Sequence, residues 1–340
     1  MDPSVMHECV PFSRQKMDPT QTELLGNNTV SEEGTPKRKK TPCLACLIVG
    51  IIIGAMVAIV VLGILIAIAV LWTGSTNRRV FPNPTYSNST DYIHFVVIGD
   101  FGFGNGIQKE TAVGMANYCA NVKQCDFIIS TGDNIYESGV SSPYDPQLKT
   151  KFEDIYNQDS LKDLDWFSVL GNHDYKKSPE AEIQYSDVNS HWKMPHYYFN
   201  FTKESRGKSF NLTFVMTDTN PFVTDYLTSS SMNTSALNRQ QPYNVDQLNM
   251  IENILSQNMG RNDSWTIVVG HHPVYSAGYH YNTPELRQQF EPLFAKYKLP
   301  LYLCGHDHFL NWLTNPSIGP TQYVLSGGGA ADAFLILHNQ

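Results

Sequence analysis

Five short clusters, each led by glycine and each directly after a strand-like apolar run, constrain this chain more than any other feature of its sequence. In chain order they are Gly99-Asp100-Phe101-Gly102, Gly132-Asp133-Asn134-Ile135-Tyr136, Gly171-Asn172-His173-Asp174, Gly270-His271-His272-Pro273 and Gly305-His306-Asp307-His308. Glycine lets the backbone turn sharply at a strand end, and the loops at strand ends in α/β sheets commonly carry functional side chains. Together the clusters offer carboxylates, imidazoles, an amide and a phenol, which is ligand chemistry for two hard metal ions.

The composition bounds the remaining classes. The 340 residues suffice for one large domain or two modest ones, and an apolar content of 41% is ample for a core. The formal net charge of −8 argues against a nucleic-acid partner, because such proteins present basic surfaces. Six cysteines are too few for a disulfide scaffold.

An uncharged apolar run over residues 44–72 precedes all five clusters. A helix needs about 20 residues to span the hydrocarbon core of a bilayer, and this run is too long and starts too late for a cleaved signal peptide. The basic cluster Lys37-Arg38-Lys39-Lys40 directly before it is typical of a cytosolic flank. We therefore expect a single-pass type II membrane protein. Its parts are a disordered cytosolic tail (1–42), a transmembrane signal anchor (43–72), a stalk (73–90) and a folded domain (91–340).

Five glycosylation sequons follow the apolar run, which favours a lumenal or extracellular place for the folded domain. Their acceptors are Asn88, Asn200, Asn211, Asn233 and Asn262. Gly50 and Gly54 form a GxxxG pattern that would suit a helix dimer, although glycine is frequent in membrane helices anyway. Cys43 and Cys46 lie at the cytosolic edge, where palmitoylation and unmodified thiols are both open.

The folded part alternates strand-like and helix-like segments, which indicates an α/β layered sheet. Strands are expected at 93–98, 127–130, 166–170, 265–269, 299–304, 309–313 and 323–326, and helices at 105–119, 147–157, 245–255 and 284–297. The aromatic and β-branched runs at 196–201 and 209–217 resemble neighbouring antiparallel strands. The Ser/Asn-rich stretch 228–241 is expected to be a surface loop. The chain ends soon after a glycine turn at 327–329, so we expect the last sheet elements to be short or missing.

Taken in order, the five clusters resemble the motifs of metallophosphoesterases, and in particular those of purple acid phosphatases. The clusters match their DxG, GDxxY, GNH followed by an acid, VxxH (Val268-Val269-Gly270-His271) and GHxH motifs. The resemblance covers residues from about 91 to 326. It implies a four-layer α/β/β/α sandwich of two mixed sheets, here preceded by one transmembrane helix.

The resemblance also implies a ligand set for two metal ions. Iron(III) would be held by Asp100, Asp133, Tyr136 and His308. Iron(II), zinc or manganese would be held by Asp133, Asn172, His271 and His306. Asp133 would bridge the two ions, and a phenolate such as that of Tyr136 suits a trivalent ion. Tyr136 is the discriminating residue, because many other metallophosphoesterases lack a tyrosine there.

Two histidines follow from the same resemblance, and the other assignments below follow from position in the sequence. His173 and His280 would contact the phosphate or protonate the leaving oxygen. His272 follows a ligand, and we interpret it as structural. Cys304 is expected to be buried and reduced, whereas a disulfide between Cys119 and Cys125 and two free thiols both remain open.

The leading hypothesis is a membrane-anchored acid phosphatase that hydrolyses small phosphate monoesters. The resemblance implies in-line attack on phosphorus by a metal-bound hydroxide, without a covalent intermediate. One alternative keeps the metals and changes the substrate: a phosphodiesterase or nucleotide pyrophosphatase of the same superfamily. Another alternative is a catalytically silent receptor ectodomain.

Overall fold

The computed structural model describes residues 91–331 and 335–337. The predicted tail, membrane span and stalk lie outside the described residues, as do Gly50, Gly54, Cys43, Cys46 and Asn88. Within 91–331 and 335–337, no helix combines the length and the apolar character needed to cross a membrane.

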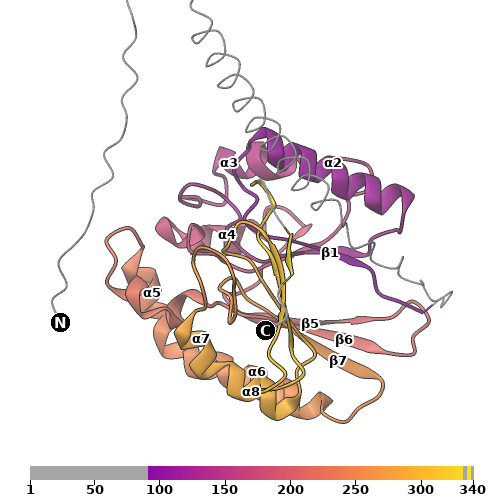
Figure 1. Cartoon of the computed structure of the whole chain (residues 1–340). Helices are drawn as coiled ribbons and strands as arrows, with labels where there is room; N and C mark the ends of the chain where they lie inside the picture. Colours follow the sequence, from indigo (N-terminus) through magenta and orange to yellow (C-terminus); the bar gives the residue numbers. More distant parts are fainter. Residues whose placement is uncertain (1–90, 332–334, 338–340) are drawn as a thin grey trace, which may run out of the picture. The chain divides into compact units, whose positions relative to one another are not determined.

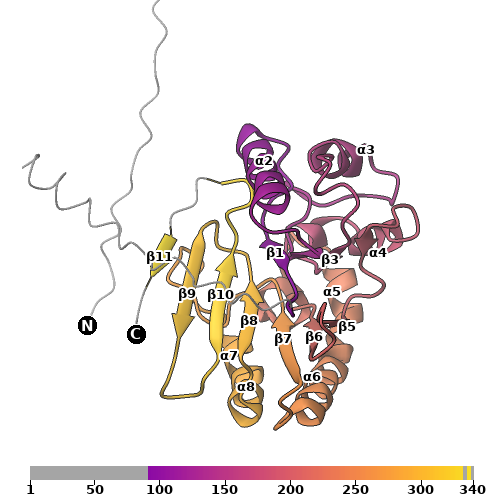
Figure 2. The ribbon, with the colours of Figure 1, turned by 90° about the vertical axis from the view of Figure 1, so that its right-hand side faces the viewer.

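Two β-sheets form the centre of the domain. The smaller contains β1 (Phe95–Ile98), β2 (Phe127–Ser130), β3 (Trp166–Ser168) and β4 (Trp192–Lys193), in that order, with every pairing parallel. The larger is mixed and has the order β11 (Leu335–Leu337), β9 (Leu310–Thr314), β10 (Gln322–Ser326), β8 (Leu301–Cys304), β7 (Ser264–Val269), β6 (Asn211–Met216), β5 (Phe199–Glu204). Its central strands β8, β7 and β6 are parallel, and β5 is antiparallel to β6 as expected. Figure 2 shows these strands side by side.

Helices lie on the two outer sides of the sheets. On one side are α2 (Gly106–Asn121), α3 (Pro146–Leu148) and α4 (Pro179–Tyr185). On the other are α5 (Thr234–Gln240), α6 (Asn244–Asn258), α7 (Pro284–Gln289) and α8 (Glu291–Tyr297). Figure 1 shows α2 and α3 above β1, and α6 to α8 on the opposite side, beyond β5 to β7. Short segments of other helical type connect these elements: η1 (Lys149–Glu153), η2 (Asp174–Lys176), η3 (Asn220–Phe222), η4 (Thr224–Leu227) and η5 (Gln241–Tyr243).

Alternate residues of the larger sheet enter different cores, which produces the layers. Along β6, Phe214 and Met216 join the cluster that also contains Phe127 of the smaller sheet. Between them, Val215 joins a second cluster with Ile251 of α6 and other helix residues. Successive side chains of a strand point to opposite faces, so the larger sheet packs against the smaller sheet on one face and against helices on the other. The expected layers, two packed sheets with helices on both outer faces, are thereby confirmed, and the smaller sheet is parallel throughout.

Two predicted elements were wrong in detail. Residues 234–240 of the predicted loop form α5, because the Asn233 side chain accepts from the Ala236 N–H at 3.1 Å and caps the helix, and because Leu237 is buried. The helix expected over 284–297 is two helices that meet at Phe290. Pro292 occupies the first turn of α8, where its missing N–H costs nothing.

The cysteine alternatives are resolved. Cys119, near the end of α2, forms a disulfide with Cys125, just before β2. Cys304 is a buried free thiol, as expected. Among the sequon acceptors, Asn200 and Asn262 are exposed, whereas Asn211 and Asn233 are half-buried; glycosylation stays a prediction.

Candidate metal centre

The five clusters lie at the carboxyl ends of five strands, two from one sheet edge and three from the other. The loops follow β1, β2 and β3 in the smaller sheet and β7 and β8 in the larger. Because β1, β2 and β3 are parallel to one another, as are β7 and β8, the carboxyl ends of these strands lie together at one edge of each sheet. The seven predicted ligand side chains come from these loops: Asp100, Asp133, Tyr136, Asn172, His271, His306 and His308.

The phenol of Tyr136 is the centre of a first group of donors. Its oxygen lies 2.7 Å from Asp133 Oδ2 and 3.1 Å from Asp100 Oδ1. The same oxygen lies 3.0 Å from His308 Nε2. These four residues are the ones predicted for the trivalent ion, and the structure brings all four together.

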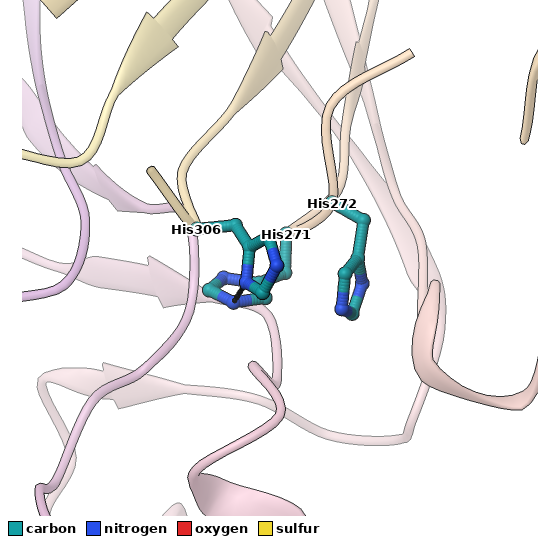
Figure 3. A group of neighbouring side chains, drawn as sticks. All are labelled: His271, His272 and His306. Carbon is teal, nitrogen blue, oxygen red and sulfur yellow. Dashed lines mark hydrogen bonds between the residues drawn. The ribbon is translucent and has the colours of Figure 1, made fainter. Parts of the chain in front are cut away.

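Asn172 is the centre of the second group. Its Oδ1 lies 3.0 Å from His271 Nε2 and 2.9 Å from His306 Nδ1, and these two nitrogens are 3.2 Å apart. Figure 3 shows the rings of His271 and His306 turned toward each other. Asp133 Oδ1 lies 3.5 Å from His271 Nε2, whereas its other oxygen faces Tyr136. Asp133 therefore stands between the two groups.

His272 lies beside these rings but uses its nitrogens elsewhere. Donor atoms of His271, His272 and His306 all lie within 4.8 Å of one another, which by distance alone would suit a metal ion. However, His272 Nδ1 is 2.7 Å from the Thr219 hydroxyl and Nε2 is 3.1 Å from the Tyr226 hydroxyl. Both nitrogens have protein partners, so His272 is structural, and Figure 3 shows its ring apart from the other two.

The buried carboxylates of this site require nearby positive charge. Asp100 and Asp133 are 0% and 2% exposed, and among the described residues neither forms an ion pair with a lysine or arginine. Burial, followed by the charge of Asp133, raises the pKa of Asp100 well above its usual value. Burial and the two carboxylates likewise raise the pKa of Tyr136. Since buried carboxylates without cations are costly, the donor set fits metal ions.

The imidazoles complement this arrangement. Burial lowers the pKa of His271 and, more strongly, that of His306, which keeps both rings neutral and able to donate a lone pair. His271 Nδ1 lies 2.8 Å from the Thr131 carbonyl oxygen, which fixes the proton there and leaves Nε2 for a ligand role.

Backbone geometry at the strand ends is unusual. Asp100, Asp133 and His306 have φ values of 58°, 51° and 73°, in the left-handed region that non-glycine residues rarely occupy. Such conformations concentrate at functional sites. Glycine is required where the loops touch: a Cβ at Gly171 would lie 2.1 Å from Asp133 Oδ1, and one at Gly305 would lie 2.5 Å from Asp100 Oδ2.

The two predicted catalytic histidines border the donor groups on different sides. The His173 ring lies 4.4 Å from the Tyr136 ring, and its Nδ1 is 2.6 Å from the Glu137 carbonyl oxygen. The His280 ring is 4.3 Å from the His306 ring. His280 is exposed and His173 half-buried, so a bound molecule can reach both.

Sequence reasoning missed the acids that support these loops. Asp174 is fully buried and accepts from the main-chain N–H groups of Gly171 (2.8 Å), Asn134 (3.0 Å) and Ile135 (3.2 Å). Its position after the GNH motif was the available signal. Glu182 accepts from the Asn134 side chain at 3.0 Å, and no local pattern announces it.

Comparison with known proteins agrees with this geometry. The sequence profile of the calcineurin-like phosphoesterase family matches residues 93–310, a span that contains all five clusters. The chain belongs to this family. Within it, the chain is 33% identical over 249 residues to purple acid phosphatase 7 of Arabidopsis thaliana, which covers 73% of each chain. It is 30% identical to human tartrate-resistant acid phosphatase type 5, over 76% of this chain and 80% of that one.

A solved structure shares the fold of this phosphoesterase. The protein is GAP50, the anchor in the inner membrane complex of Plasmodium. It superimposes on this chain with a TM-score of 0.58 and 24% sequence identity, over 70% of this chain and 72% of GAP50. The predicted family and the hydrolase class of the acid phosphatase type are confirmed by these relatives. Membership of the purple acid phosphatases implies a binuclear metal centre, and the phosphoesterase has candidate ligands for it.

Proposed function

We propose that this chain is a binuclear-metal acid phosphatase that hydrolyses small phosphate monoesters. The observation that carries the proposal is the convergence of two donor groups on one carboxylate, that of Asp133. The group around Tyr136 is rich in anionic oxygens and suits Fe(III), whereas the amide and imidazoles of the other group suit Fe(II), Zn(II) or Mn(II). The proposed ligands are Asp100, Asp133, Tyr136 and His308 for the first ion, and Asp133, Asn172, His271 and His306 for the second.

When bound, such a pair of cations neutralises phosphate charge and lowers the pKa of a coordinated water. The chain's own residues bind and orient the ester. The Glu137 carbonyl oxygen lies 2.6 Å from His173 Nδ1 and helps to hold the ring beside Tyr136, where His173 would contact a phosphate oxygen. The main-chain N–H of His280 donates to the buried Asp307 carboxylate at 2.9 Å, which fixes the ring beside His306. From there a ring nitrogen of His280 gives its proton to the leaving oxygen.

The membrane part of the proposal rests on the sequence. Residues 44–72 form the uncharged apolar run, a basic cluster precedes it, and the sequons follow it. We propose that this run is a type II signal anchor and that the phosphatase domain faces the lumen or the cell exterior. Protease protection of the domain in sealed membrane vesicles checks this; digestion by protease added from the cytosolic side would contradict it.

The function is tested on the full chain in detergent by metal analysis, visible absorption and phosphate release. We expect two metal ions per chain, including iron, and colour from an iron(III)–tyrosinate pair. Asp133→Ala and His306→Ala should each lower phosphate release more than about 100-fold, because even the loss of a ligand's supporting partner costs about 10–100-fold. Asp126→Ala is a matched change directly before the amino-terminal end of β2, away from the candidate metal centre, and should leave phosphate release unchanged.

Two other outcomes would replace the proposal. Faster turnover of a phosphodiester than of the matching monoester would favour a phosphodiesterase or nucleotide pyrophosphatase. A colourless chain that binds no metal and releases no phosphate would favour a silent receptor ectodomain.

A further inference from the structure

One half-buried lysine, Lys176, lies beside the candidate metal centre without a carboxylate partner. Its Nζ is 3.0 Å from His173 Nδ1 and 3.4 Å from His173 Nε2. The His173 ring in turn lies 4.4 Å from the ring of Tyr136, a proposed metal ligand. Among residues 91–331 and 335–337, no aspartate or glutamate forms an ion pair with Lys176. Because a charge that is partly removed from water favours an opposite charge nearby, this ammonium group suits an anionic ligand.

The backbone around Lys176 is fixed, so the ammonium group is presented from a defined place. Lys176 is the last residue of η2, and its main-chain N–H donates to the His173 carbonyl oxygen at 3.1 Å. The carbonyl oxygens on either side, those of Tyr175 and Lys177, accept from the main chain and the side chain of Asn233 at 2.9 Å and 2.6 Å. When a ligand binds, only the lysine side chain itself then loses freedom, which limits the entropic cost of binding.

We infer that Lys176 is a substrate-binding residue whose ammonium group, together with His173, holds one oxygen of the reacting phosphate. This inference rests on the proposed function, in which His173 contacts that phosphate. His173 can accept from at most one of the three N–H groups of Lys176, because an imidazole has at most one acceptor nitrogen. The other two have no acceptor in the described part of the chain. A phosphate oxygen that approaches His173 Nε2 comes within reach of the ammonium group 3.4 Å away, and hydrogen bonds between opposite charges are the strong ones.

Binding of inorganic phosphate to the metal-loaded full chain gives the first test, by calorimetry. Lys176→Met should raise the dissociation constant about 10-fold, the low end of what a hydrogen bond to a charged group contributes. Lys176→Arg keeps a cationic donor and should bind phosphate more tightly than Lys176→Met. Lys177→Met is the matched control, because it removes the same charge from the next residue, which is exposed, and it should leave the dissociation constant unchanged.

Turnover gives a second test, because a contact made equally to the bound ester and to the transition state changes KM and not kcat. With glycerol 2-phosphate, Lys176→Met should raise KM about 10-fold and keep kcat. Wild-type phosphate affinity in Lys176→Met would overturn the inference, and so would an equal loss in Lys177→Met, which would assign the effect to net charge; ester hydrolysis by the wild type would leave the proposed function standing in both cases. If the variants bind phosphate in the expected order but the wild type hydrolyses no ester, the proposed function fails while the inference stands.

Discussion

Replacing Asp174 should loosen the metal centre without removing any ligand. Its carboxylate receives the main-chain N–H of Gly171 from the loop after β3, and those of Asn134 and Ile135 from the loop after β2. These loops also carry Asn172 and Asp133, so one buried side chain holds a proposed ligand of the second ion in register with the bridging carboxylate.

The magnitude follows from these hydrogen bonds. Asp174→Ala leaves three buried N–H groups without an acceptor, each costing about 1–3 kcal/mol, so we expect a loss of about 4 kcal/mol in the free energy of unfolding. Asp174→Asn keeps one oxygen and faces an NH₂ group toward a donor, which should cost about 2 kcal/mol. Metal affinity should fall about 10- to 100-fold in the alanine variant, as for other groups that orient ligands.

Chelator titration of the metal-loaded full chain, followed by visible absorption and metal analysis, measures the affinity; urea unfolding measures stability. Asp126→Ala is the control, because Asp126 accepts from His94 N–H and from Arg206 at the amino-terminal ends of the strands. This variant should lose stability and keep its metal affinity. If Asp174→Ala unfolds more easily yet holds metal as tightly as the wild type, the positioning role is refuted.

Three further changes have defined outcomes. Tyr136→Phe should abolish the visible tyrosinate band while the circular dichroism spectrum stays unchanged. Gly171→Ala would place a Cβ only 2.1 Å from Asp133 Oδ1 and so displace that carboxylate. The variant should lower metal affinity at least about 10-fold in the same titration. Burial raises the pKa of Asp218 to about 6, so this carboxyl should contribute about 3 kcal/mol of stability that is lost as pH rises from about 4 to 6; the difference in unfolding free energy between the wild type and Asp218→Asn across that range measures it.

The strands and the loops after them could be predicted because their signals are local. A run such as Phe127 to Ser130 begins with three apolar residues, and glycine follows within two residues. The burial that stabilises α5 is not local: Leu237 lies in the core cluster that contains Phe214. Strand β4 has only two residues, too few for a periodic pattern.

The candidate site likewise contains features that local sequence predicts and features that depend on distant residues. Spacing and the family resemblance predicted which side chains the structure brings together, because the motifs are short and continuous. The support network was not predictable, since Asn134 meets Asp174 across 40 residues and Glu182 across 48. Nor could sequence show that His272 is held by Thr219, 53 residues away, rather than by a metal ion.

The buried acids fall into two classes that explain how one fold can hold so many of them. Asp100 faces the donor groups, and bound cations would favour its ionised form. Asp174 and Glu182 lie behind the loops, where burial is the main cause that raises the pKa of Asp174 to about 7 and that of Glu182 well above its usual value. Asp174 and Glu182 stabilise the folded state when they are protonated, at a pH below about 4, the pKa of such a carboxyl in the unfolded chain. This contribution is lost as the pH rises through the higher pKa that each group has in the folded state. Acid conditions therefore relieve the buried charge behind the site, which suits a phosphatase that works at low pH.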